Sequence, residues 1–150
     1  MAANAKDLKR PPVVAPGEGM TDAVHNGLFV AYSDTFVVGD TLPVTLFNVP
    51  KNTYIYDLIL DVQTAFEDSG TGATIIAGYT GDCDAFFAST TATAVKCYSM
   101  HGAAGGVKSG GYLTTGDVVV EASWATTCSV GGGQARIVFK RYGDESYRQP

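Results

Sequence analysis

The segment from Thr53 to Phe66, TYIYDLILDVQTAF, constrains the fold most, because its side chains alternate between two faces along its whole length. A period of two residues is the pattern of a β-strand and does not fit the period of a helix. We expect one face to pack in a core and the other to be mixed. The expected core face carries Tyr54, Tyr56, Leu58, Leu60, Val62, Thr64 and Phe66, and the opposite face carries Ile55, Asp57, Ile59, Asp61, Gln63 and Ala65.

Further short strand patterns follow, separated by residues that favour turns. Near the C-terminus, Val118, Val120, Ala122 and Trp124 share one face of a segment, and in the last segment Ile137 and Phe139 oppose Arg136, Val138 and Lys140. The expected strands are 28–32, 36–38, 44–49, 53–66, 74–79, 85–88, 95–100, 111–115, 118–125 and 134–142, with turns at 67–72, 81–82, 109–111, 115–117 and 131–133. The run 85–95 leaves room for a single helical turn. The regular spacing predicts an all-β sandwich or barrel.

Size and charge restrict the classes of function. A chain of 150 residues favours one domain with a sizeable core. Only 17% of the residues are charged, and the formal net charge is -5. That sign disfavours a domain that holds nucleic acid by neutralising phosphates, so we expect no direct nucleic-acid partner. No window is long and apolar enough to span a bilayer, and the start MAANAKDLKRPP lacks the apolar core of a signal peptide. We therefore expect no membrane partner.

The first 24 residues differ in composition from the rest and are expected to form an extended arm. They contain Pro11, Pro12 and Pro16 and almost no large apolar side chains. In the first ten residues, three basic side chains stand against one acidic side chain, a net charge of +2. The charge of -5 for the whole chain then leaves -7 for residues 11–150. A basic tip on an acidic body predicts a partner for the tip. We divide the chain into an arm (1–24), a β-domain (25–142) and a polar tail (143–150).

Candidate catalytic and metal-binding residues are few and poorly spaced. Asp57 and Asp61 lie four residues apart on one strand face, roughly 13 Å at about 3.3 Å per residue, which is too far for a glycosidase pair. Asp82 and Asp84 lack the spacing of a calcium loop. The two histidines, His25 and His101, are expected to be solvated loop residues, and the glycine-rich stretch HGAAGGVKSGG (101–111) is expected to be a flexible surface loop. We expect a protein that binds and is not an enzyme, with no cofactor and no metal.

The cysteine pattern also gives no indication of a metal site. Cys83, Cys97 and Cys128 are odd in number, and their spacings match neither a disulfide framework nor a CxxC metal site. We expect reduced, half-buried thiols.

Two stretches of the sequence form a recognisable pattern: GDTLPVTLFNVPKNTYIYDLILDVQTAFEDSGTGATIIAGYTGDCDAFFAST and the later strand GGYLTTGDVVVEAS (110–123). The positions that carry this pattern are Val49, Pro50, Thr53, Ile55, Asp57, Leu58, Val62, Thr64, Ala65, Phe66, Gly78, Gly81, Asp82, Asp84, Phe86, Ala88 and Ser89. Through these positions, residues 39–142 resemble the capsid cement, or decoration, proteins of tailed bacteriophages.

This resemblance implies a jelly-roll-like β-sandwich on the outer surface of the virion head, assembled in the host cytoplasm. The implied partners are the major capsid protein and further copies of the chain, with a homodimer favoured over a homotrimer. Such a protein bridges neighbouring capsid subunits and resists internal DNA pressure. The residues expected to dock the arm onto the capsid are Lys6, Lys9, Arg10, Pro11 and Pro12. Tyr54 and Tyr56 are the expected oligomer interface. Trp124 belongs with them, and the strand pattern of all three residues favours the core first and an interface second.

Two other functions stay open. The first is a tail or head-fibre module that binds host surface glycans through exposed tyrosines and the loop 101–111. The second, much weaker, is a small β-sandwich enzyme with a metal at Asp82 and Asp84.

Overall fold

The computed structural model describes residues 6–7, 28–69, 71–102 and 106–142, and in this part of the chain it is built almost entirely of β-strands. The only helical segment among these residues is the short 3-10 turn η1 (Met100–Gly102). The strands are β1 (Lys6–Asp7), β2 (Phe29–Tyr32), β3 (Phe36–Val37), β4 (Val44–Val49), β5 (Thr53–Asp68), β6 (Thr71–Gly72), β7 (Thr74–Tyr79), β8 (Asp82–Thr91), β9 (Cys97–Ser99), β10 (Tyr112–Leu113), β11 (Val118–Trp124) and β12 (Cys128–Arg141).

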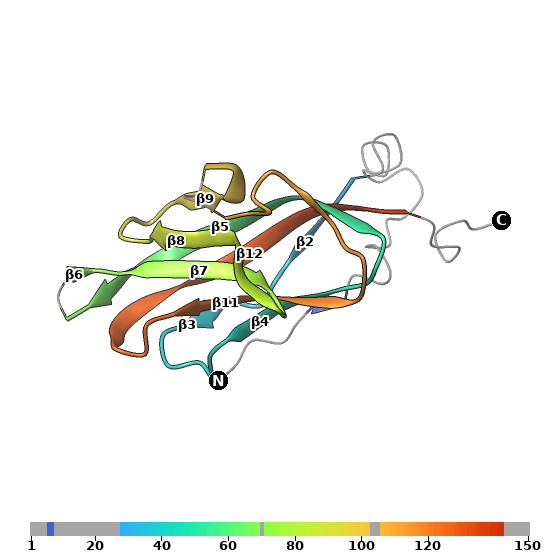
Figure 1. Ribbon diagram of the computed structural model, residues 1–150. Helices are drawn as coiled ribbons and strands as arrows, with labels where there is room; N and C mark the ends of the chain where they lie inside the picture. Colours follow the sequence, from blue (N-terminus) through green and yellow to red (C-terminus); the bar gives the residue numbers. More distant parts are fainter. Residues whose placement is uncertain (1–5, 8–27, 70, 103–105, 143–150) are drawn as a thin grey trace.

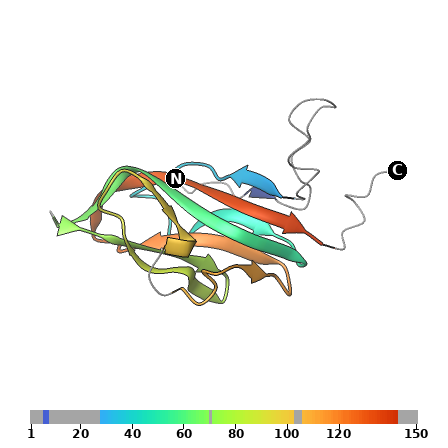
Figure 2. The same ribbon diagram turned by 90° about the horizontal axis from the view of Figure 1, so that it is seen from above.

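The strands form two sheets that pack face to face as a β-sandwich. The five-stranded sheet has the order β1-β4-β11-β7-β8, in which β1 is parallel to β4 and the other pairs are antiparallel. The seven-stranded sheet has the order β10-β5-β12-β2, with β3 also paired to β12 and with β6 and β9 also paired to β5. Figure 1 shows β7, β11 and β4 in front of β5 and β12, and Figure 2 shows the two layers from above. The predicted all-β sandwich is therefore confirmed.

The core lies between the sheets and is filled by the inward side chains of both. Trp124 on β11 is largely buried and contacts aromatic rings from the opposite sheet, with its ring centre 5.8 Å from that of Phe36 and 5.2 Å from that of Phe66. The predicted face of β11 is confirmed, because Val120, Ala122 and Trp124 are buried. Buried Ile137 and Phe139 confirm the predicted pattern of the last strand.

The alternation along β5 is interrupted near its start, and part of the predicted core face is therefore wrong. Val138 on β12 pairs with Asp57, but the next residue, Phe139, pairs with Ile55, so Tyr56 is an extra residue in β5. Such a bulge shifts the side chains before it to the opposite face. Ile55 is buried and Tyr56 is exposed, whereas the predicted inward positions from Leu58 to Val62 are confirmed.

The predicted turn at the glycines 131–133 is also wrong, because β12 runs through them without a break. A side chain at Gly131 would meet the ring of Phe66, and a side chain at Gly133 would meet the backbone of Asp61. These glycines allow another part of the chain to approach the strand closely. Close approach is, like a turn, a common reason for glycine in a sequence of this kind.

Two predictions about the middle of the chain are corrected as well. The run 85–95 contains no helical turn, because β8 extends to Thr91. The described part of the glycine-rich stretch is not a free loop. The amide of Lys108 donates a hydrogen bond to the carbonyl of Ala85 at 2.7 Å, and buried Gly106 lies against the backbone of Phe86. In the described part of the chain, no helix is long and apolar enough to cross a membrane.

Candidate partner-binding surfaces

The start of the predicted docking arm lies on the edge of the five-stranded sheet. β1 pairs with β4 in parallel register, with Lys6 opposite Phe47 and Asp7 opposite Asn48. The other residues predicted for docking, Lys9, Arg10, Pro11 and Pro12, and also His25, lie outside the described residues. The arm's docking role therefore stays a prediction. The new information is that its first described residues contact the body of the protein.

Three tyrosines gather on the outer face of the seven-stranded sheet, which we call the tyrosine cluster: Tyr54, Tyr56 and Tyr142. The rings of Tyr54 and Tyr56 meet edge to face, with their centres 4.6 Å apart. The pKa of Tyr56 is raised, first of all by a hydrogen bond between its side chain and that of Tyr142. The ammonium nitrogen of Lys140 lies 5.2 Å from the ring centre of Tyr142. Both residues predicted for an oligomer interface are thus on the surface, half-buried and exposed respectively. Trp124, by contrast, belongs to the core.

A polar cluster lies beside the tyrosine cluster on the same face. The hydroxyl of Ser99 on β9 donates a hydrogen bond to Asp57 Oδ1 at 2.8 Å, and the backbone amide of His101 donates to the hydroxyl of Ser99 at 3.2 Å. His101 Nε2 lies 2.6 Å from the carbonyl oxygen of Tyr56, so this nitrogen carries the proton. His101 is therefore held in place and is not a simple solvated loop residue. Because its Nε2 is hydrogen-bonded to the carbonyl oxygen of Tyr56, His101 is not arranged as a general base for the hydroxyl of Ser99.

Asp61 belongs to a second polar group farther along β5. Arg136 Nη2 donates a hydrogen bond to the sulfur of Cys97 at 3.1 Å, and the thiol of Cys97 lies 3.7 Å from Asp61 Oδ1. Asp57 and Asp61 thus have separate partners, and neither is arranged as one half of an acid–base pair.

The three thiols are free, as expected, but they are not all half-buried. Cys83 and Cys97 are exposed and Cys128 is buried, where desolvation raises the pKa of its thiol. The prediction of half-buried thiols was wrong on this point.

An apolar strip runs along the edge of the seven-stranded sheet formed by β2 and β3, and we call it the edge strip. It consists of Val30 and Tyr32 on β2, Val37 on β3 and Val130 on β12. Tyr32 is 51% exposed and Val37 53%. Exposed apolar side chains of this kind are suited to contact with another protein. Our sequence analysis missed this strip, although Val30 and Tyr32 alternate with the inner residues of β2.

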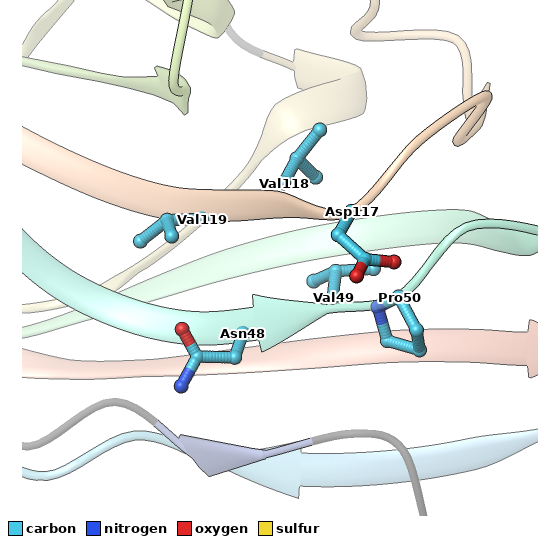
Figure 3. A pocket seen from close by; sticks show the side chains of 6 residues that line it. All are labelled: Asn48, Val49, Pro50, Asp117, Val118 and Val119. Atoms are coloured by element: carbon cyan, nitrogen blue, oxygen red, sulfur yellow. The ribbon is translucent and has the colours of Figure 1, made fainter.

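A small pocket lies where β4 ends and β11 begins (Figure 3). Its volume is about 230 Å³, and its lining residues are Asn48, Val49, Pro50, Asp117, Val118 and Val119. Asp117 is exposed, and its Oδ1 accepts the backbone amide of Lys51 at 3.0 Å. The pocket therefore combines valine side chains with one carboxylate. Sequence analysis missed it, because it depends on the pairing of two segments far apart in the chain.

The residues weighed for a metal centre do not form one. Asp82 and Asp84 both lie on β8, the first half-buried and the second exposed. Within the described ranges, no three His, Cys, Asp or Glu side chains come close enough together to hold a metal ion.

Comparison with known proteins shows the fold. No protein-family model matches the chain, and no curated protein matches it. The chain is similar to a solved chain in the cyanophage Pam1 capsid asymmetric unit, with a TM-score of 0.59 and 17% identity over 89% of this chain and 95% of that chain. It is also similar to a chain in the acidic stable capsid structure of Helicobacter pylori bacteriophage KHP30. There the TM-score is 0.56, with 15% identity over 75% of this chain and 86% of that chain.

Proposed function

We propose that this chain is a structural protein of a bacteriophage virion that binds the outside of the head and cements or decorates neighbouring major capsid protein subunits. The observation that carries the proposal is the likeness of 89% and 75% of the chain to chains from two phage capsid structures. The likeness covers 95% of one of those chains, so it concerns a complete unit of similar size and not a shared fragment. We infer a role in binding, without catalysis.

The surface supports binding over a broad area. The edge strip and the tyrosine cluster place apolar and aromatic side chains on the seven-stranded sheet, where a neighbouring subunit can reach them. Tyrosine is enriched at protein interfaces, because its ring buries area while its hydroxyl stays satisfied. We assign Tyr54 and Tyr56 to contact between copies of the chain, with a homodimer as the favoured assembly.

The arm supplies the second part of the proposal. Lys6, Lys9 and Arg10 give its tip a positive charge, and Pro11 and Pro12 disfavour regular structure there. We assign these residues to docking on the major capsid protein. Long-range attraction of this kind is weakened by salt. On a repeating lattice, several weak arm contacts also combine through multivalency.

The experiment is a retention assay with phage heads that lack the protein. Full-length chain and a variant without residues 2–24 are incubated with such heads, and the bound fraction is measured after sedimentation. We expect the variant to keep its β-sheet circular dichroism and to lose retention. A charge-matched pair, Lys9→Gln in the arm against Lys96→Gln at an exposed lysine of the body, separates the effect of the arm from that of general charge. Unchanged retention after deletion of the arm would overturn its docking role.

Binding of host surface glycans by a tail or head-fibre module is the second candidate. The tyrosine cluster favours it, because adjacent accessible aromatic rings are suited to stack on sugar rings. A glycan array with the full chain separates the two functions. Specific glycan binding that is lost in Tyr56→Ala supports the module, and an array without binding supports the capsid role.

A further inference from the structure

The edge strip and the tyrosine cluster are connected across the outer face of the seven-stranded sheet. The register of β2, β12 and β5 places outward side chains in two neighbouring rows: Tyr32, Arg136 and Ile59 in one row, and Val30, Val138 and Asp57 in the next. Half-buried Ile59 and Val138 lie between the two surfaces described above. The outer face therefore carries apolar or aromatic side chains from β2 across to β5, which is typical of a surface that binds another protein.

The charges in the middle of this face are separated by strand. Between the levels of Tyr54 and Asp61, the basic side chains are Arg136 and Lys140 of β12, and the acidic ones are Asp57 and Asp61 of β5. All four are half-buried. Because β5 and β12 are neighbours in the sheet, a basic column runs directly beside an acidic column.

This arrangement distinguishes between two ways of placing two copies face to face. When two sheets pack in an aligned manner, a twofold axis in the plane between them runs either across the strands or along them. An axis across the strands sets β12 against the partner's β12, so the two basic columns meet and repel. An axis along the strands, between β5 and β12, sets each β12 against the partner's β5. Each basic column then meets an acidic one, and unlike charges favour this second arrangement.

We propose that a second copy of this chain binds the outer face of the seven-stranded sheet about a twofold axis along β5 and β12, with Arg136 of each copy paired with Asp57 and Asp61 of the other. The inference rests on the homodimer assigned above and specifies its surface and its symmetry.

The register supports these pairs. Arg136 lies level with Ile59, and each carboxylate is two residues away along β5, about 6.6 Å at about 3.3 Å per residue. Arg136 Nη2 donates a hydrogen bond to the sulfur of Cys97. A guanidinium has further N–H donors, which are available to a partner's carboxylates. Lys140 lies level with Tyr54, so in the dimer its ammonium group lies over the ring of the partner's Tyr54, a favourable cation–π contact.

Sedimentation equilibrium of the full chain tests the assembly in solution. We expect a dimer whose dissociation constant rises with salt, because charge pairs contribute to it. Arg136→Glu makes both symmetric contacts repulsive and should weaken the dimer about tenfold or more. Lys51→Glu, the same charge change at an exposed lysine between β4 and β5, is the matched control and should leave the dimer unchanged. A monomer, a trimer, or a dimer unaffected by Arg136→Glu would overturn the proposal.

A mixture of two variants separates a lost contact from a lost fold. Arg136→Glu alone, and Asp57→Lys with Asp61→Lys alone, should each sediment as a folded monomer, as judged by β-sheet circular dichroism. Mixed in equal amounts, they should form a heterodimer, because both symmetric contacts then join opposite charges. Folded variants that fail to associate when mixed would contradict the pairing.

Cross-linking tests the strand arrangement in a chain that keeps all these charges. In the proposed dimer, β2 of one copy faces β9 of the other, whereas within one chain β12 and β5 separate these strands by three spacings of about 4.8 Å. Tyr32→Cys should therefore be linked by a short bismaleimide to Cys97 of the second copy, giving a covalent dimer whose joined peptides mass spectrometry identifies. Links that join position 32 to itself, or Cys97 to itself, would indicate an axis across the strands and overturn the proposal.

These measurements use no phage heads. A failed dimer test therefore leaves the capsid role to the retention assay, and a failed retention assay leaves the dimer to these tests.

Discussion

The hydroxyl oxygen of Thr114 accepts the backbone amide of Thr53 at 2.9 Å, and both residues are almost completely buried. Each hydroxyl in turn donates to the carbonyl oxygen of Pro50 at 2.8 Å. These hydrogen bonds join the connection between β4 and β5 to Thr114, the residue that follows β10. They also fix Pro50, which lines the pocket.

We predict that Thr114→Val destabilises the domain by about 1–3 kcal/mol, the cost of leaving a buried donor or acceptor unsatisfied. The variant keeps the shape of the side chain but removes the acceptor for the Thr53 amide and one donor to Pro50. Urea unfolding measures the change in the free energy of unfolding. Thr115→Val, at the exposed neighbouring position, is the control and should change it little. An equal loss in both variants would refute the buried network.

We predict that Gly131→Ala also destabilises the domain, by about 1–3 kcal/mol. Gly131 has a φ of 149°, and a methyl group there would meet the ring of Phe66 in the core. Gly116→Ala is the matched control, because nothing lies within 4 Å of the added carbon. Thermal unfolding of the two variants should separate them clearly. If Gly131→Ala were as stable as the control, the close approach of β12 to Phe66 would be incorrect.

The acid dependence of stability tests the surroundings of Glu121 on β11. Desolvation by partial burial raises the pKa of this carboxyl. Between its ordinary pKa and the raised value, the folded state binds more protons than the unfolded state, so the free energy of unfolding falls as the pH rises through this window. Glu121→Gln should therefore raise the melting temperature at pH 7 and give no gain below pH about 4, where the native carboxyl is neutral.

The control for that variant is Glu67→Gln, at an exposed carboxylate on β5. Because this side chain is exposed, the variant should change the melting temperature at pH 7 little. A Glu121→Gln variant less stable than the native chain at pH 7 would show that the ionised carboxylate has a favourable partner.

Alkaline titration tests the contact between Tyr79 and Tyr112, whose rings are stacked with their centres 4.9 Å apart. A hydrogen bond to Tyr112, followed by burial, raises the pKa of Tyr79 to about 12. The stabilisation from this bond is fully present below pH about 10 and is lost as the pH rises through about 12. Tyr112→Phe keeps the ring and removes the acceptor, so the absorbance of the Tyr79 phenolate should appear at lower pH. An unchanged titration would contradict the bond.

The sequence predicts the fold class well and fails where the register changes. The alternation in β5 correctly places the buried side chains from Leu58 to Val62, but it places Tyr56 inward. A single extra residue opposite β12 reverses the face, and only the pairing of the two strands reveals it. Gly131 and Gly133 predict a turn, but they lie in β12. Glycine is needed at these positions because the ring of Phe66 and the backbone of Asp61 leave no room for a side chain.

The candidate surfaces could be predicted only in part. Tyr54 and Tyr56 are identified by their residue type, although the reason for their exposure, the bulge, is not visible in the sequence. The pocket beside Asp117 could not be predicted, because it joins β4 to the start of β11, which are far apart along the chain. His101 and Asp57 likewise meet only because β9 pairs with β5.

The measurement that tests the central claim most directly is the number of copies of this chain in each purified virus particle, determined by mass spectrometry against the major capsid protein. A protein that cements or decorates the whole head is predicted to be present in a number of the same order as the major capsid protein. A few copies in each particle, or none, would contradict this account.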